Sequence, residues 1–224
     1  MCGRFTSLLS PELMNAIREI FGITPPKQFE PRYNIAPTQQ VWVVRSEGDH
    51  NRLELMKWGL VPSWAKDPAI GSRMINARSE SVRDKPAFRH SIRYRRCIVP
   101  VSGFYEWSHA EGKKQPHFIH MADGSPICFA GLWDHWKGPG EENFIETFTI
   151  LTTAANKLLQ PIHDRMPVIL RPDDYGLWLN REMHDPEQLT YIYKPLPSNL
   201  LTLYRVSDLV NNPRFDSPAC IARC

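Results

Sequence analysis

The chain begins Met1-Cys2-Gly3-Arg4-Phe5, and this stretch organises the rest of the molecule. Because the second residue is as small as cysteine, we expect Met1 to be removed, which leaves Cys2 at the start of a short leading strand. Its α-amine, with an ordinary pKa of about 7.7 to 8.0, is then partly unprotonated near neutral pH. That amine can form an imine with an aldehyde, and the neighbouring thiol can close a thiazolidine ring on the same carbon. The alternative is that Cys2 is a small buried hydrophobic residue.

Composition favours one intracellular domain. The 224 residues are 42% hydrophobic, which is enough to bury a substantial core. Five cysteines without paired short spacing indicate reduced thiols rather than a disulfide framework. The net charge of +3 means that attraction to a polyanion depends on local patches. We find no secretory signal or apolar run of membrane-spanning length, and we expect a cytoplasmic location, nucleoid-associated in a bacterium.

Hydrophobic periodicity predicts many short strands with a few helices. A helix is expected from Pro11, capped by Ser10 and ended by Gly22, followed by a proline-rich loop over residues 24–40. Helices are also expected from Thr153 to Leu159, from Pro172 and from Pro186. The expected strands cover residues 41–45 and 52–58 as a hairpin, then 72–78, 97–101, 116–121, 126–133, 143–152 and 200–206.

Two positions suit proton transfer. Glu106 lies in Gly103-Phe104-Tyr105-Glu106-Trp107, where burial would raise its pKa towards neutrality and make it a general acid or base. A hydrogen-bonded structural carboxylate is the competing interpretation. His163 lies in a polar loop between Pro161 and Pro167, and histidine is the natural proton shuttle near pH 7.

Other residues suit an oxygen-rich or nucleic-acid ligand. Asn76 and Arg78 project to the same side of a strand, where they can bind phosphate or cap the next turn. Trp64 is the better candidate of its segment for an exposed stacking face, whereas Trp58 suits the core. Residues 83–96 carry six basic side chains against one acid, which indicates either a phosphate-binding surface or a solvated helical face.

Six ordered motifs between residue 2 and about residue 170 closely resemble the SOS-response-associated peptidase (SRAP) family. The motifs are Met1-Cys2-Gly3-Arg4-Phe5, Tyr33-Asn34-Ile35-Ala36-Pro37, Trp58-Gly59-Leu60-Val61-Pro62-Ser63-Trp64, Ile75-Asn76-Ala77-Arg78-Ser79-Glu80, Gly103-Phe104-Tyr105-Glu106-Trp107 and His163-Asp164-Arg165-Met166-Pro167. The resemblance implies a single α+β domain over residues 1–224, built around a curved, barrel-like, mostly antiparallel sheet with flanking helices. Residues 2–170 would carry the motifs, and residues 171–224 would form supporting helices, a strand and a tail.

The resemblance also implies a function, which is to sense and shield abasic sites in single-stranded DNA. Cys2, freed of Met1, would form a thiazolidine crosslink to the opened sugar. Glu106 and His163 would be the acid/base pair, and Asn76 would orient the sugar or the amine.

The remaining residues implied by the resemblance bind DNA. Arg4 and Arg78 would hold phosphates, Pro37 and Trp64 would wedge and stack at the bent strand, and Asn34 belongs to the same DNA-binding loop as Pro37. The expected partner is single-stranded DNA containing abasic sites. No cofactor, metal, membrane or obligate protein partner is expected, and the protein is expected to be a monomer.

Three alternatives remain open. The first is a thiol peptidase or autopeptidase, the activity for which the family was first described, with Cys2, His163 and Glu106 as a triad-like set. The second is a glutamine amidohydrolase that uses the same processed amino-terminal cysteine. The third is a non-catalytic single-strand binder, which leaves Cys2 without a purpose.

Overall fold

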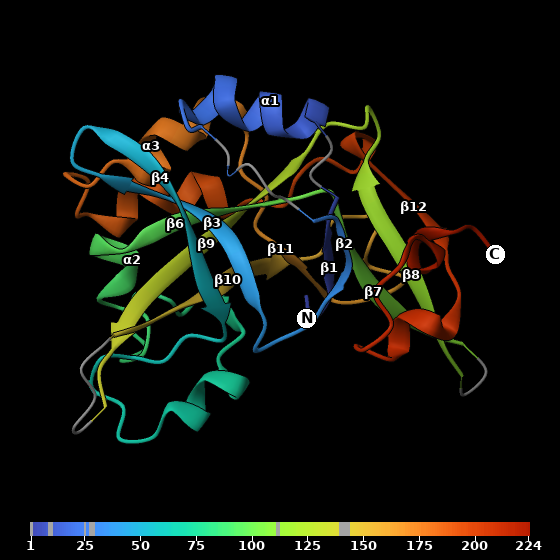
Figure 1. Cartoon of the computed structure of the whole chain (residues 1–224), viewed down its shortest axis with the longest axis horizontal. Helices are drawn as coiled ribbons and strands as arrows, with labels where there is room; N and C mark the ends of the chain where they lie inside the picture. Colours follow the sequence, from blue (N-terminus) through green and yellow to red (C-terminus); the bar gives the residue numbers. More distant parts are fainter. Residues whose placement is uncertain (1, 9–10, 25, 27–29, 111–112, 139–143) are drawn as a thin grey trace.

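The described residues of the computed structural model are 2–8, 11–24, 26, 30–110, 113–138 and 144–224, and they form two β-sheets with short helices around them (Figure 1). The first sheet is antiparallel throughout and contains β1 in its interior, hydrogen-bonded between β2 and β7. In spatial order its strands are β12 (Leu201–Arg205), β8 (Lys113–Met121), β7 (Gly103–Ala110), β1 (Phe5–Ser7) and β2 (Arg32–Ile35).

The second sheet closes into a five-stranded barrel. Its ring runs through β10 (Ile145–Ala154), β4 (His50–Trp58), β3 (Gln40–Glu47), β6 (Arg96–Val101) and β9 (Ile127–Trp136), and β9 pairs with β10 again. Only the β10–β4 pairing within the ring is parallel. Two short strands extend β10, namely β5 (Asn76–Arg78) and β11 (Arg165–Pro167). The predicted α+β fold around a barrel-like, mostly antiparallel sheet is confirmed.

The helices are short and lie outside the sheets (Figure 1). The α-helices are α1 (Pro11–Phe21), α2 (Ser91–Tyr94) and α3 (Tyr175–Leu179). The 3₁₀ helices are η1 (Pro68–Arg73), η2 (Pro172–Asp174), η3 (Pro186–Tyr193), η4 (Ser198–Leu200), η5 (Asp208–Asn211) and η6 (Pro218–Ile221). Gly22 ends α1 as predicted, with φ of +68°, whereas Ser10 lies outside the described residues. None of the helices formed by described residues is long and apolar enough to cross a membrane.

The barrel core is aromatic and reaches the amino terminus. Trp58 is fully buried between Phe5 and Phe148, with ring centroids 4.7 and 6.4 Å away. Cys2 belongs to the same buried cluster. Trp64, in contrast, is 58% exposed, so the predicted division between a core Trp58 and a surface Trp64 is confirmed.

Three sequence-based element predictions are wrong in part. The loop 24–40 contains β2, which forms because β1 supplies its hydrogen-bonding partner. The strand 72–78 shrinks to β5, since residues 68–73 form a 3₁₀ helix capped by Asp67. The helix 153–159 does not form, because β10 continues to Ala154 and pairs there with β11.

The first sheet is packed so closely at Gly103 that it leaves no room for a side chain. A Cβ atom there would lie 2.6 Å from the carbonyl oxygen of Ile119 and 2.4 Å from the Phe118 ring. Gly103→Ala should therefore lower the free energy of unfolding by about 1–3 kcal/mol, as overpacking does. The matched control is Gly176→Ala in α3, where nothing lies within 4 Å and alanine favours the helix by roughly 1 kcal/mol. Urea unfolding measures both, and equal stability of the two variants would contradict this packing.

Candidate active site

The pairing of β1 fixes Cys2 inside the protein. Phe5 lies opposite Phe104 of β7, and the backbone N–H of Tyr105 donates to the Arg4 carbonyl at 2.9 Å. The chain therefore runs along β7 towards Glu106 as it approaches its amino terminus. Cys2 is 0% exposed, and its carbonyl accepts a 2.8 Å hydrogen bond from Asn76 Nδ2. The structure thus brings the first two predicted site residues into contact.

One of the two polar side-chain atoms of Asn76 has no hydrogen-bond partner among the described residues. It lies on β5, where Asn76 pairs with Ile150 of β10. Its Nδ2 is committed to Cys2, whereas its Oδ1 is buried and has no hydrogen-bond partner among the described residues. A buried amide oxygen of this kind is an unused acceptor beside the Cys2 backbone. It is suited to accept a hydrogen bond from an amine or a hydroxyl group.

Glu106 lies close enough to Cys2 for their charges to interact. Burial raises the pKa of the Glu106 carboxyl to about 7, and the negative charge of Asp164 adds to this rise. Burial also raises the pKa of the Cys2 thiol, and the negative charge of Glu106 raises it further. Near neutral pH, Glu106 is therefore divided between its acid and base forms while the thiol stays protonated.

His163 is held by the loop that leads into β11. Its Nδ1 lies 2.9 Å from both the Arg165 backbone N–H and Asp164 Oδ1, and these two contacts need opposite states of Nδ1. The backbone N–H is an obligatory donor and the Asp164 side chain is 83% exposed, so we assign Nδ1 as an acceptor and the proton to Nε2. Burial lowers the pKa of His163, and the ring is mostly neutral at pH 7.

A cavity of about 430 Å³ is lined by two of these residues, Glu106 and His163, and not by Cys2 or Asn76. Arg4, Glu106 and His163 line it together with Trp107, His109, Lys114 and Asn211. Arg4 is half-buried, its guanidinium carbon lies 6.0 Å from the centre of the Trp107 ring, and burial lowers its pKa. The cavity therefore combines a carboxyl and an imidazole with a cation.

Arg4 is positioned from behind by Asn34 and by the carboxyl-terminal segment. One Arg4 nitrogen donates to Asn34 Oδ1 at 2.7 Å and to the Val210 carbonyl at 2.6 Å. Asn34 Nδ2 donates to the carbonyls of Val210, Asn212 and Phe215 at 3.2, 3.0 and 2.7 Å. Because Asn34 is 0% exposed and its amide is bonded inside the protein, this structure places it behind the cavity rather than at a DNA-contacting surface.

The other predicted DNA-binding residues lie at the surface. Arg78 is exposed at the end of β5, two residues from Asn76. Pro37 is half-buried and precedes Thr38, whose φ of +73° is unusual for a β-branched residue. Trp64 does not line the 430 Å³ cavity. The structure thus brings Cys2, Asn76, Glu106, His163 and Arg4 together, with Asn34 behind them, and leaves the three surface residues outside that cluster.

Sequence reasoning missed part of the cavity wall. Trp107 and His109 follow Glu106 on β7, and Lys114 pairs with His109 across the β7–β8 hairpin. The hairpin signal around residues 112–114 could have placed Lys114 near Glu106. Nothing in the sequence indicated Asn211, because its place depends on the folding of the carboxyl-terminal segment onto β2 and β7. Among the described residues, no group of three or more histidine, cysteine or acidic side chains could hold a metal ion.

Comparison with known proteins identifies relatives over nearly the whole chain. The model of a family described as SOS response associated peptidase (SRAP) matches residues 1–213. The Bacillus subtilis protein called abasic site processing protein YoqW is 42% identical over 224 residues, with 99% of each chain covered. Abasic site processing protein YedK of Escherichia coli is 33% identical over 95% of each chain.

Solved structures agree with the fold. A crystal structure of a protein from Bacteroides thetaiotaomicron has a TM-score of 0.78 and 27% identity, with coverage of 85% of this chain and 84% of that one. A protein from Bordetella bronchiseptica has a TM-score of 0.79 and 26% identity, with coverage of 92% and 100%.

Because the pKa of Glu106 is raised in the folded chain, we expect the free energy of unfolding to depend on pH. Below pH 4.5 the carboxyl is protonated in the folded and unfolded chain alike. Between pH 4.5 and about 7, the unfolded chain loses this proton while the folded chain keeps it, so the free energy of unfolding falls as pH rises. Above about pH 7 the carboxyl is ionised in both states and the loss is complete. Glu106→Gln removes this loss, and its stability relative to the wild type should improve by about 3 kcal/mol across that range.

Urea unfolding at a series of pH values measures the difference. Glu182→Gln, which changes an exposed carboxyl, is the matched control and should follow the wild type in parallel. A constant difference between Glu106→Gln and the wild type at all pH values would show that Glu106 is not a desolvated carboxyl.

Proposed function

The chain belongs to the SOS response associated peptidase (SRAP) family, and from this we propose that it processes abasic sites in single-stranded DNA by a covalent crosslink through Cys2. The observation that carries the proposal is the buried Cys2 backbone, held by Asn76 and lying beside the Glu106 carboxyl. In the 224-residue chain the Cys2 nitrogen is still in a peptide bond to Met1. Removal of Met1 would create an aminothiol at this position.

The first chemical step opens the abasic sugar. The sugar is mostly a cyclic hemiacetal, so a base must take the proton of the C1′ hydroxyl while an acid protonates the ring oxygen. Glu106, with a pKa of about 7, can accept or donate near neutral pH. Neutral His163 presents a proton on Nε2 and can serve as the second group. Both line the same cavity, as two groups that divide one proton transfer must.

The second step forms the crosslink with one water released. The Cys2 amine attacks the C1′ aldehyde carbon, and loss of the former carbonyl oxygen as water gives an imine. The thiol sulfur then adds to that carbon while its proton passes to the nitrogen, which closes the thiazolidine. The unused Asn76 Oδ1 would orient the amine or a sugar hydroxyl during these steps. The activity modifies the protein itself and does not turn over as an ordinary hydrolase or lyase does.

DNA would be held by cations and flat surfaces around the cavity. Arg4 and exposed Arg78 are suited to flanking phosphates, which fix position without reading sequence. Trp64 and Pro37 would support the bent strand, since base stacking contributes roughly 1–3 kcal/mol per base. Asn34 acts in this proposal by positioning Arg4. We further propose that the protein works as a cytoplasmic monomer.

The raised pKa of the Cys2 thiol weighs against the peptidase alternative. A thiol peptidase attacks with a thiolate, which forms most readily on a cysteine whose pKa is lowered. Here burial and the negative charge of Glu106 both disfavour the thiolate. The proposed order, in which the amine reacts first and the thiol closes the ring, does not require a preformed thiolate.

A crosslinking assay tests the proposal. Processed protein is mixed with a single-stranded oligonucleotide that contains one abasic site, and the products are separated on a denaturing gel. We expect a covalent band with the wild type and none with Cys2→Ala or with a chain that carries an uncleavable amino-terminal extension. Cys224→Ala, which removes an exposed thiol far from β1 in the sequence, is the matched control and should crosslink normally.

Two results would contradict the proposal. One is a wild-type protein, shown to lack Met1, that gives no covalent band. The other is a Cys2→Ala variant that crosslinks as well as Cys224→Ala does.

A further inference from the structure

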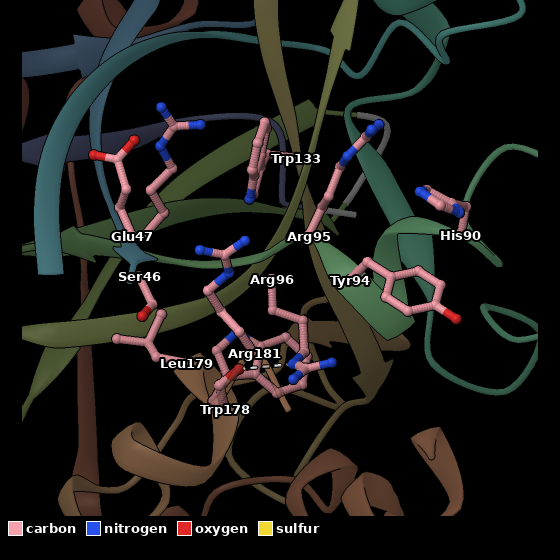
Figure 2. Close-up of a pocket in the computed structure, with 11 residues that line it drawn as sticks. Ser46, Glu47, His90, Tyr94, Arg95, Arg96, Trp133, Trp178, Leu179 and Arg181 are labelled. Atoms are coloured by element: carbon pink, nitrogen blue, oxygen red, sulfur yellow. Dashed lines mark hydrogen bonds between the residues drawn. The ribbon is translucent and has the colours of Figure 1, made fainter. Parts of the chain in front are cut away.

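A second cavity, of about 290 Å³, lies on the side of the barrel near α2 and α3. Four of its lining residues are arginines, namely Arg45, Arg95, Arg96 and Arg181. We call this site the arginine pocket. Figure 2 shows Arg181 and Arg96 near Trp178, Arg95 beside Trp133, and Tyr94 with His90 at one rim. Its volume is at the lower end of the range for small-ligand sites, roughly 300–1,000 Å³.

The positive charge of the arginine pocket is only partly balanced. Arg45 pairs with Glu146 at 3.0 Å and with Glu54 at 3.6 Å, and Arg95 pairs with Asp134. Arg96 and Arg181 form no ion pair with a carboxylate among the described residues. Glu47, the one acidic residue of the lining, is itself paired with Arg52. Two cations therefore remain for a ligand.

Arg96 provides a fixed charge at the floor of the pocket. It is 6% exposed, and its guanidinium donates to the backbone carbonyls of Ile92, Arg93, Trp178 and Asn180. Burial lowers its pKa to about 10, so it is still charged at neutral pH. A buried cation that has no carboxylate partner among the described residues creates a positive potential that favours an anion nearby. Arg181 is exposed and also lines the pocket, so its guanidinium is accessible to such an anion.

Beside the pocket lies a row of exposed rings and arginines, namely His90, Tyr94, His184, Arg89 and Arg93, which we call the exposed track. The rings of His90, Tyr94 and His184 follow one another with centroids 4.9 Å apart, and Tyr94 is 48% exposed. Arg89 and Arg93 are exposed in the same turn of chain. Alternation of arginines with exposed rings is the pattern of surfaces that follow a nucleic-acid strand. A closed site for a free metabolite would not need such a track.

The arginine pocket is separate from the 430 Å³ cavity that Glu106 and His163 line. Arg96 is the first residue of β6, whereas Gly103 and Glu106 come after β6 has ended at Val101. The length of β6 is about 17 Å at roughly 3.3 Å per residue. In Figure 1, α2 and α3 lie at the left, away from the amino terminus near the centre. The two cavities share no lining residue.

We propose that the arginine pocket is a second DNA contact, which holds a backbone phosphate of the strand with Arg181 above Arg96 while a neighbouring base stacks on Tyr94. It rests on the proposed function only in that the ligand is DNA. This assignment also gives the basic segment 83–96 a role. Its members are buried Arg96, the ion-paired Arg83 and Arg95, exposed Lys85, and Arg89 and Arg93 of the exposed track.

Binding of an undamaged fluorescent single-stranded oligonucleotide, measured by anisotropy over a range of salt concentrations, tests this inference. Arg181→Ala should weaken binding at low salt and reduce the salt slope by about 0.7, the value for one phosphate of a single strand. Tyr94→Ala should weaken binding roughly tenfold with no change in slope. Arg18→Ala, an exposed arginine on α1, is the matched control and should change neither quantity.

Two further measurements separate the possible failures. Crosslinking of the wild type to an abasic oligonucleotide is measured in parallel, and its absence would show that the proposed function fails whatever the binding assay gives. A deoxynucleoside monophosphate is also tested for its effect on Tm. If it raises Tm of the wild type but not of Arg181→Ala while oligonucleotide binding is unchanged, the pocket binds a free nucleotide and the inference is wrong. Oligonucleotide binding by Arg181→Ala and Tyr94→Ala equal to that of Arg18→Ala also overturns it.

Discussion

The position of β1 inside a sheet is the constraint on which the candidate active site depends. An amino-terminal strand at a sheet edge would be free to fray, whereas β1 is hydrogen-bonded to β2 on one side and to β7 on the other. This pairing brings Cys2 into the barrel core and next to Glu106, and Asn76 then holds the Cys2 carbonyl. Loss of a single residue, Met1, would convert this buried backbone into a reactive aminothiol without rearrangement of the sheet.

Burial sets the protonation states near Cys2, and cationic side chains lie around that centre. Burial brings the pKa of the Glu106 carboxyl to about 7 and keeps the Cys2 thiol protonated. These states suit proton transfer and the addition of the thiol to an imine. The cations Arg4 and Lys114 line the cavity beside this centre, and the position of Arg4 depends on distant parts of the chain. Arg4, for example, is held by Asn34 and by the carbonyl of Val210, more than 200 positions away in the sequence. The carboxyl-terminal segment therefore contributes to the site and is more than support for the barrel, although residues 171–224 carry none of the six motifs.

Local patterns predicted the hairpin of residues 41–58, the buried Trp58 and the exposed Trp64, because alternation and turn residues are read over a short window. Segments whose structure depends on a distant partner were not predictable in this way. β2 is a strand because β1 pairs with it, and Thr153 stays in β10 because Met166 pairs with it. The same reason applies to the site. The sequence motifs indicated Cys2, Glu106, His163 and Asn76, but not Asn211 or the buried place of Asn34, which follow from tertiary contacts.

In the proposed adduct the amine and the thiol of Cys2 are both bonded to one carbon of the sugar, and counting the remaining free thiols of the covalent product measures this directly. The adduct is purified, unfolded, alkylated and weighed by intact mass spectrometry. A thiazolidine adduct should have the mass of a chain without Met1 plus the oligonucleotide less one water, with one fewer alkylated thiol than the five cysteines of the free chain. An adduct that still contains Met1, or one in which all five thiols are alkylated, would contradict it.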